Sequence, residues 1–183
     1  MKSGAVFWFT GLSGAGKTTV AGGAQRALER EGYSVLILDG DQIRSGLHRD
    51  LGFSEAEIEE NNARIAGLCE ARRAEADVIL VPIISPYRRS RQAAKKRLGG
   101  RCFEVYFDAS LECVMKRDVK GLYAKAIRRE LSGVIGFSPE SVYETPLTPD
   151  FTVRSGAQTV DESVRDLVGF IKDCLRREGE RKL

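Results

Sequence analysis

A complete phosphate-binding motif occupies residues 11–18, where the sequence reads GLSGAGKT and fits the pattern G-x-x-x-x-G-K-[ST]. Glycines in such a loop let backbone amides turn inward around phosphate oxygens, and the start of the following helix adds partial positive charge. The pattern positions Lys17 to reach the β- and γ-phosphates of a nucleoside triphosphate and the Thr18 hydroxyl to bind Mg²⁺. The alternative is a glycine-rich turn that only joins a strand to a helix. An apolar run before the motif and a helical pattern after it favour nucleotide binding.

Two acids and an arginine follow the second apolar run, in the segment Asp39-Gly40-Asp41-Gln42-Ile43-Arg44. Asp41 could hold Mg²⁺ or accept a proton from an attacking hydroxyl, and Arg44 could bind an anionic acceptor. The alternative, compatible with these roles, is that Asp41 caps a short helix.

Polar and basic residues also follow the third and fourth apolar runs. Ser85 either caps the next helix or presents its hydroxyl to a ligand, and Arg88 is expected to point inward while its basic neighbours form a solvated surface. Arg117 could stack on an adenine or clamp the transferred phosphoryl group, and Lys120 could reach an acceptor; a charged helix end is the alternative. His48 is the only histidine, which argues against a histidine-based metal cluster or triad, and we expect it at the surface or against a lid.

Strands alternating with helices must position these residues. Apolar runs at 5–10, 34–38, 78–82, 103–107 and 151–153 are predicted strands, and the segments 16–31, 54–75, 87–98, 110–116 and 161–177 show helical patterns. Several runs are continuously apolar, as in a parallel sheet covered on both faces. The fold class predicted is α/β, a doubly wound, mostly parallel sheet with flanking helices, whose ligands bind at the carboxyl ends of the strands.

Residues 119–149 break this rhythm, with close glycines, three prolines and little apolar periodicity. A long segment without regular structure is usually functional or disordered. Beside a phosphate-binding loop, we predict a mobile lid.

Bulk composition is that of an ordinary globular protein. The 183 residues, 42% hydrophobic and 30% charged, suit a single domain over 1–183. A net charge of +3 gives no reason to expect a nucleic-acid partner, and no apolar run is long enough for a signal peptide or a membrane span. Four cysteines without CxxC or zinc spacing favour a reducing compartment, and hence the cytoplasm.

Several sequence blocks together resemble the adenylylsulfate (APS) kinase family of P-loop kinases, which phosphorylate the 3′-hydroxyl of adenosine 5′-phosphosulfate with MgATP. The matching blocks run through most of the chain: GLSGAGKTT at 11–19, LDGDQIRSGLHRDLGFS at 38–54, EENNARI at 59–65, IISPYRRSRQ at 83–92 and RDVKGLYAKA at 117–126. The phosphate-binding motif alone defines only a superfamily, whereas the later blocks are much more specific.

The resemblance implies a nucleotide site with cofactors ATP and Mg²⁺. Asp41 and Lys17 would be catalytic, with Mg²⁺ held by Thr18 and Asp41, and Arg117 would lie beside the adenine. The ATP phosphates would be bound by Gly11, Ser13, Gly14, Ala15, Gly16, Lys17, Thr18 and Thr19.

The resemblance also implies an acceptor site for APS. Phe53 would stack on the APS adenine, and Ser85 matches a serine that some family members carry phosphorylated. The acceptor-binding residues would be Arg44, Phe53, Asn61, Ile84, Ser85 and Lys120. A homodimer is implied, and we expect neither a regulatory segment before the first strand nor an attached ATP sulfurylase domain.

Departures from the family pattern fall in the acceptor site. Ile58 replaces an arginine that helps to bind APS, and an R-R pair is reduced to Ala63-Arg64. The usual F-T-G-I-D becomes residues 134–138, VIGFS, so that Val134 takes the place of the aromatic that sandwiches the adenine, unless Phe137 substitutes. Losing one charged hydrogen bond and one aromatic contact would weaken APS binding by roughly 30- to 2,000-fold.

Two alternatives to an APS kinase stay open at this point. The first is a kinase of the same fold that acts on a different nucleotide-linked acceptor. The second is a nucleotide-binding regulatory module without turnover, against which the intact Lys17, Thr18 and Asp41 argue.

Overall fold

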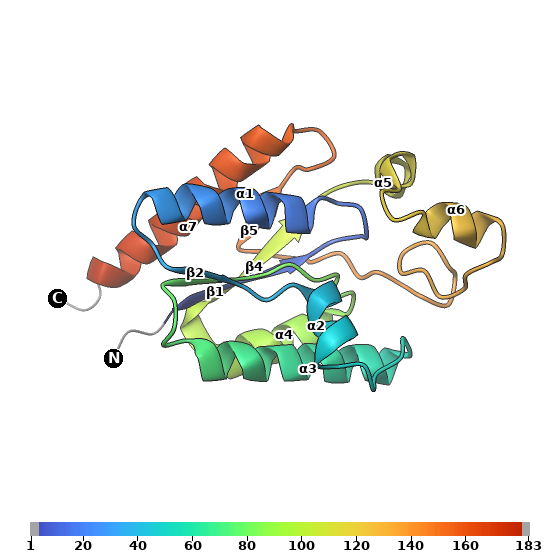
Figure 1. Cartoon of the computed structure of the whole chain (residues 1–183), viewed down its shortest axis with the longest axis horizontal. Helices are drawn as coiled ribbons and strands as arrows, with labels where there is room; N and C mark the ends of the chain where they lie inside the picture. Colours follow the sequence, from blue (N-terminus) through green and yellow to red (C-terminus); the bar gives the residue numbers. More distant parts are fainter. Residues whose placement is uncertain (1–3, 181–183) are drawn as a thin grey trace.

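Five parallel strands form a single sheet in the order β2-β3-β1-β4-β5 (Figure 1). The computed structural model describes the backbone of residues 4–180 and the side chains of residues 4–177. Along the chain the elements are β1 (Ala5–Thr10), α1 (Lys17–Arg30), β2 (Val35–Ile37), α2 (Gly40–Gly46), α3 (Glu55–Arg72), β3 (Val78–Val81), α4 (Arg88–Leu98), a 3₁₀ turn (Gly99–Arg101), β4 (Cys102–Phe107), α5 (Leu111–Arg117), α6 (Leu122–Ile127), β5 (Phe151–Val153) and α7 (Val160–Glu180). The predicted α/β fold with a parallel sheet is confirmed.

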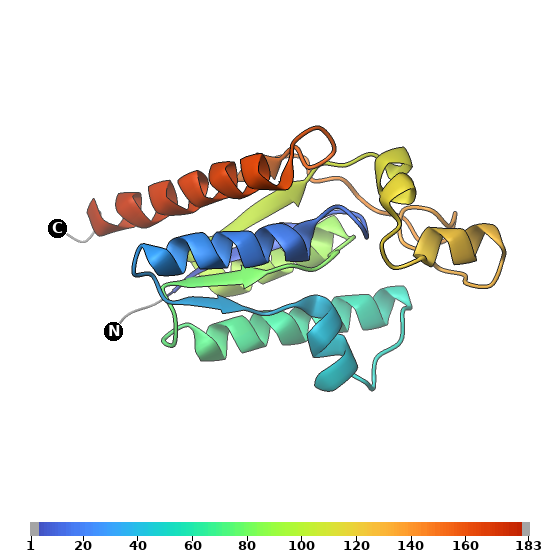
Figure 2. The ribbon, with the colours of Figure 1, turned by 45° about the horizontal axis from the view of Figure 1, so that its top comes forward.

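Helices cover both faces of the sheet. Helices α1 and α7 pack together on one face, and α3 and α4 pack together on the other (Figures 1 and 2). The central strand β1 is buried throughout and divides its side chains between two cores: Phe7 and Phe9 face the α1 and α7 side, whereas Trp8 faces the α3 and α4 side. This double burial explains why the strand is a continuous apolar run in the sequence.

The carboxyl ends of the strands lie at the right of Figure 1, where the loops, α5 and α6 gather; β1 begins and α7 ends at the left. The phosphate-binding loop leaves the central strand β1, and α2 follows directly after β2. The candidate residues therefore converge on one edge of the sheet, as expected for an open parallel sheet.

The segment 119–149 differs from the prediction of a segment without regular structure, because it contains α6 (Leu122–Ile127). The carboxylate of Asp118 accepts hydrogen bonds from the backbone amides of Tyr123 and Ala124 at the start of this helix. Six residues with local capping show no detectable apolar period, so α6 leaves no helical signal in the sequence. Among the described residues, none of the helices has the length and apolarity needed to cross a bilayer.

Candidate active site

The phosphate-binding loop joins β1 to α1 and depends on glycine at its turns. Gly14 has φ +79° and Gly16 has φ +89°, conformations that cost an L side chain free energy. Gly16 is also the residue that precedes the first turn of α1, so the unpaired amides of that turn open toward the loop. This is the geometry of an anion-binding helix terminus.

Lys17 is buried beneath its own loop. Its side-chain Nζ donates hydrogen bonds to the carbonyl oxygens of Gly11 and Leu12, each at 2.8 Å. Burial lowers the pKa of Lys17 to about 7, with a smaller contribution from the nearby ammonium of Lys120. The carboxylates of Asp41 and Asp39 oppose this shift, and a nucleotide phosphate at this position would add further negative charge.

Thr18 is paired with Asp39, a residue that the sequence did not single out. The Thr18 Oγ1 donates to the Asp39 Oδ2 at 2.8 Å. The other carboxylate oxygen of Asp39 accepts from the amides of Asp41 and Gln42, so Asp39 is the N-cap of α2. The alternative in which Asp41 caps this helix is therefore wrong. In the sequence, Asp39 and Asp41 are equally suited to cap the helix that follows. The choice depends on where β2 ends and the helix begins, which the sequence does not define to within two residues.

Asp41 lies in the first turn of α2, with a largely exposed carboxylate that forms an ion pair with Lys120 from the segment before α6. We expected Thr18 and Asp41 to hold Mg²⁺ together. In the structure, the side chain that is hydrogen-bonded to Thr18 is Asp39. Both carboxylates stand at the β2 end, next to the phosphate-binding loop.

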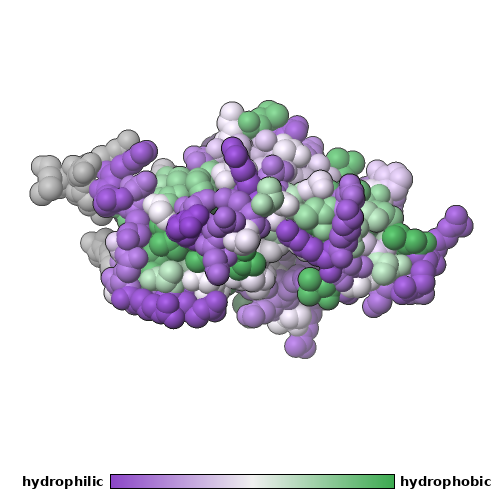
Figure 3. Space-filling view, turned by 90° about the horizontal axis from the view of Figure 1, so that it is seen from above, coloured by the Kyte–Doolittle hydropathy of each residue, from purple (hydrophilic) through white to green (hydrophobic). Residues whose placement is uncertain are grey.

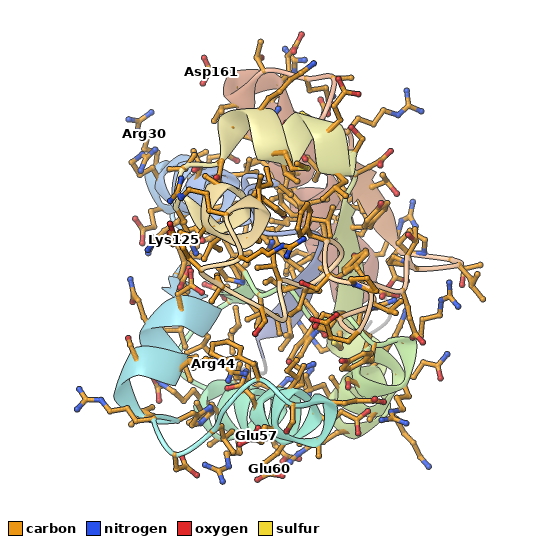
Figure 4. All side chains as sticks on the ribbon, turned by 90° about the vertical axis from the view of Figure 1, so that its right-hand side faces the viewer. Arg30, Arg44, Glu57, Glu60, Lys125 and Asp161 are labelled. Carbon is orange, nitrogen blue, oxygen red and sulfur yellow. The ribbon has the colours of Figure 1, made fainter. Side chains whose placement is uncertain are left out.

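A cavity of about 460 Å³ lies beside this loop, between α2, α3 and the end of β3. Six of the predicted site residues line it: Asp41, Arg44, Phe53, Asn61, Ile84 and Ser85. Lys120 is not among its lining residues but forms an ion pair with Asp41, which is. Figure 4 looks onto this edge, with Lys125 of α6 on one side and Arg44 and Glu57 on the other.

Arg44 and Phe53 are held against each other. The Arg44 guanidinium lies 4.6 Å from the centre of the Phe53 ring and donates to the carbonyl of Gly52. Glu57, in turn, accepts from the amides of Gly52 and Ser54 on either side of Phe53. The ring is 71% exposed, so its position is set by its backbone and leaves a broad aromatic face open.

His48 is buried, which corrects the expectation that it lies at the surface or against a lid. Its Nδ1 is 2.9 Å from the Oδ1 of Asn61, which also lines the cavity. A buried histidine beside an asparagine on the next helix has no signature in a single sequence.

Ser85 is buried and does not cap α4, because Tyr87 precedes that helix without a side-chain cap. Its Oγ accepts hydrogen bonds from the Nε1 of Trp8 and the Nδ2 of Asn62, both at 3.1 Å. The arginine that points inward is Arg91 and not, as expected, Arg88. Arg91 donates to the carbonyls of Ser85, Pro86 and Glu144 and pairs with Glu104 at 2.5 Å.

The departures from the family pattern also need a correction. Ile58 lines the cavity, as expected, but Val134 is buried in the core on the α1 and α7 side of the sheet. Phe137 does not replace the missing aromatic in the cavity, since it packs edge-on against Tyr123. The residue that this segment contributes to the cavity wall is Ile135.

Arg117 lies on the opposite side of the phosphate-binding loop. It ends α5, and its Nη2 donates to the carbonyl oxygen of Ser155 at 2.6 Å. Val114 of the same helix lies against Gly14 of the loop. Ser155, in the turn after β5, also lacks a recognisable sequence signal.

This combination of fold and site defines a P-loop phosphotransferase: a parallel sheet with a phosphate-binding loop after its central strand and a second, polar cavity at the same edge. The family model described as Adenylylsulphate kinase matches residues 3–154. The chain belongs to the adenylylsulphate kinase family.

Similarity to individual relatives extends along nearly the whole chain. An adenylyl-sulfate kinase from Citrobacter koseri is 44% identical over 175 residues, which cover 95% of this chain and 84% of that protein. One from Halothermothrix orenii is 42% identical over 172 residues, or 94% and 91%. The structure of the Mycobacterium tuberculosis APS kinase CysC in complex with AMPPNP and APS superposes with a TM-score of 0.88 at 37% identity, covering 94% of this chain and 99% of that one.

Proposed function

We propose that this protein transfers the γ-phosphoryl group of ATP to the 3′-hydroxyl of APS. The observation that carries the proposal is the position of Asp41, which lies in the wall of the acceptor cavity and in the segment that Asp39 joins to Thr18 of the phosphate-binding loop. One carboxylate thus stands where a bound nucleotide and a bound acceptor would meet.

Lys17, the loop amides and the start of α1 would bind the ATP phosphates. Arg117 and the turn at Ser155 would lie beside the adenine. On the acceptor side, Arg44 would bind an anionic group and Phe53 would stack on the APS adenine, with Asn61, Ile84 and Ser85 forming the inner wall. Asp41 would accept the proton of the 3′-hydroxyl as the new bond forms, and positioning and charge account for most of the catalysis in such transfers.

The residues fit Mg²⁺ in the way that kinases usually bind it, through few protein ligands and the nucleotide phosphates. The described residues contain no group of three histidine, cysteine or carboxylate side chains placed to enclose a metal. Thr18 and Asp39 place two oxygen atoms in contact with each other, and Asp41 adds a carboxylate in the first turn of the helix that Asp39 caps. When bound there, Mg²⁺ would neutralise charge that develops on the phosphates.

Purified protein mixed with MgATP and APS, with ADP release detected by a coupled assay, tests the proposal. We expect turnover well above the APS-free control, and Lys17→Ala should abolish it. ADP release no faster than in that control would show that APS is not the acceptor. The alternative of another nucleotide-linked acceptor is not favoured, since the family model and the relatives agree on one enzyme.

The cytoplasmic location remains a prediction. Burial raises the pKa values of Cys69 and Cys102 to about 12, so these thiols are unreactive packing groups.

A further inference from the structure

The inner wall of the acceptor cavity carries two polar side chains, Ser85 and Asn61, whose free hydrogen-bonding groups are determined by their contacts with neighbouring protein side chains. Ser85 and Asn61 both line the cavity and are 3% and 6% exposed. Each is held from the protein side by a buried partner, and the atoms used in those contacts determine what is left for a ligand.

The Ser85 hydroxyl has one proton to donate and two lone pairs that accept. Trp8 donates through its Nε1, which can only be a donor, and Asn62 donates through its Nδ2. Both lone pairs are therefore occupied from inside the protein. The hydroxyl proton is thus left for a ligand in the cavity.

Asn61 shows the same arrangement. Its Oδ1 lies 2.9 Å from the Nδ1 of His48, and because a carbonyl oxygen only accepts, the proton belongs to the histidine. The amide nitrogen of Asn61 remains for the cavity. Each of the two residues thus offers a hydrogen-bond donor to the cavity.

The backbone around Ser85 keeps this arrangement in place. Ser85 has φ +44°, an uncommon conformation for a non-glycine residue, and such strain persists where the surroundings hold it. Its carbonyl accepts from the Thr10 Oγ1 at 3.0 Å and the Arg91 Nη1 at 2.7 Å. Strained, over-determined residues of this kind cluster at ligand sites.

We propose that Trp8, Asn62 and His48 are positioning residues that leave the two donors described above facing an oxygen-rich anionic group of the acceptor. This inference rests on the proposed function, in which the acceptor carries a phosphosulfate. Arg44 and Arg49, which also line the cavity, complement the same charge. With both lone pairs engaged, the Ser85 hydroxyl is oriented as a hydrogen-bond donor to the acceptor.

Substitutions at Asn62 separate polarity from packing. Asn62→Asp is isosteric, but a carboxylate accepts the Ser85 proton and turns it away from the cavity. We expect the KM for APS to rise about 10- to 100-fold while the KM for ATP stays unchanged. Asn62→Leu is the matched control: it removes one donor without adding an acceptor, so the effect on the KM for APS should be several-fold smaller.

A double-mutant cycle with Ser85→Ala separates this effect from charge repulsion. If the introduced carboxylate acts by capturing the Ser85 proton, Asn62→Asp has little further effect on the KM for APS in the Ser85→Ala background. An equal effect in both backgrounds would overturn the proposal, as would Asn62→Leu raising that KM as much as Asn62→Asp.

Binding is measured independently of turnover through Trp8, the only tryptophan in the chain, whose indole N–H gives a single NMR resonance. We expect APS to move this resonance in the wild-type protein and to move it much less in Ser85→Ala. APS turnover with an unmoved resonance would overturn this inference and leave the proposed function intact. If APS neither binds nor turns over, both are wrong.

Discussion

The Lys17 side chain shows how burial prepares a single residue of the site to bind a phosphate. Its ammonium is surrounded by protein, with two backbone carbonyls as its hydrogen-bond partners. Burial disfavours the charged form, which brings the pKa of Lys17 to about 7. The phosphates of ATP reverse this balance, because they favour the protonated lysine.

ATP binding near neutral pH should therefore be accompanied by proton uptake at Lys17. With a pKa of about 7 in the free protein, the uptake is about half a proton at pH 7, about a tenth at pH 6 and about nine-tenths at pH 8. Calorimetry in buffers of different ionisation enthalpy measures it. Lys17→Arg, which stays charged, is the control that removes the contribution of the nucleotide itself. Equal uptake in wild type and Lys17→Arg would contradict the assignment.

Alanine substitutions at Asp39 and Asp41 should differ in their effect on the free energy of unfolding of the protein. Asp39→Ala removes the N-cap of α2, which lowers the free energy of unfolding by about 1–2 kcal/mol. Asp41→Ala removes an exposed carboxylate and should leave stability nearly unchanged while lowering kcat about 10²- to 10⁴-fold. Urea denaturation and steady-state kinetics on both variants test this. An Asp41→Ala protein as unstable as Asp39→Ala would show that the assignment of the cap is wrong.

Ile135 and Val134 should respond oppositely to an introduced aromatic. Ile135→Phe adds a ring to the cavity wall and should strengthen APS binding about two- to tenfold. Val134→Phe overpacks a buried position and should cost about 1–3 kcal/mol of stability without strengthening binding. APS titration and thermal unfolding distinguish the two. If only Val134→Phe binds APS more tightly, Val134 and not Ile135 occupies the position of the aromatic residue that contacts the APS adenine in the family.

The sequence was sufficient to place residues that belong to a local pattern: Lys17 and Thr18 lie at the phosphate-binding loop, as the motif predicts, and their roles in binding ATP and Mg²⁺ stay predictions. The sequence did not predict the role of a residue where that role depends on which of two nearby side chains points into the protein. Asp39 against Asp41, Ile135 against Val134 and Arg91 against Arg88 are one- to three-residue choices that only tertiary packing decides.

At the scale of elements, the segment that contains α6 is fastened to the rest of the fold at both ends. Near α6, the Tyr123 hydroxyl donates to the carbonyl of Ser13 in the phosphate-binding loop at 3.0 Å. Farther along, the Tyr143 hydroxyl lies 2.9 Å from the Thr10 Oγ1, and because Thr10 already donates to carbonyls, Tyr143 is the donor. We propose that these contacts define the closed position of a lid.

Tyr143→Phe removes one of these fastenings and should raise the KM for APS, with a loss of about 1 kcal/mol in stability. Tyr106→Phe is the matched control, since its hydroxyl contacts the exposed carboxylate of Asp108 at 3.3 Å. Kinetics with each substrate varied in turn provide the test. A Tyr106→Phe enzyme with the same defect would remove the special role of Tyr143.

Elements with a long pattern were predictable and short ones were not. All five strands follow from apolar runs, and β1 and β5 match their predicted limits. Helix α6 was missed because its start is determined by the Asp118 side chain and its packing by Tyr123, contacts that a six-residue pattern does not encode.

At the scale of the whole molecule, the two cores share the five-stranded sheet, and on the face seen from the α1 and α7 side hydrophilic residues alternate with patches of hydrophobic ones (Figure 3). We therefore expect one cooperative unfolding transition, with circular dichroism and Trp8 fluorescence giving the same midpoint. Saturating MgATP should raise that midpoint by mass action. Non-coincident curves would indicate that the predicted single domain is wrong.

The expected homodimer is checked separately by light scattering.

Strand β1 begins, and α7 ends, at the edge of the sheet remote from the substrate-binding loops (Figure 1). A tether that continues from the start of β1 or from the end of α7 would thus attach on the side of the sheet opposite the substrate-binding loops. Immobilised on a support, or joined to the enzyme that makes its acceptor, the kinase would keep an unobstructed entrance for both nucleotides.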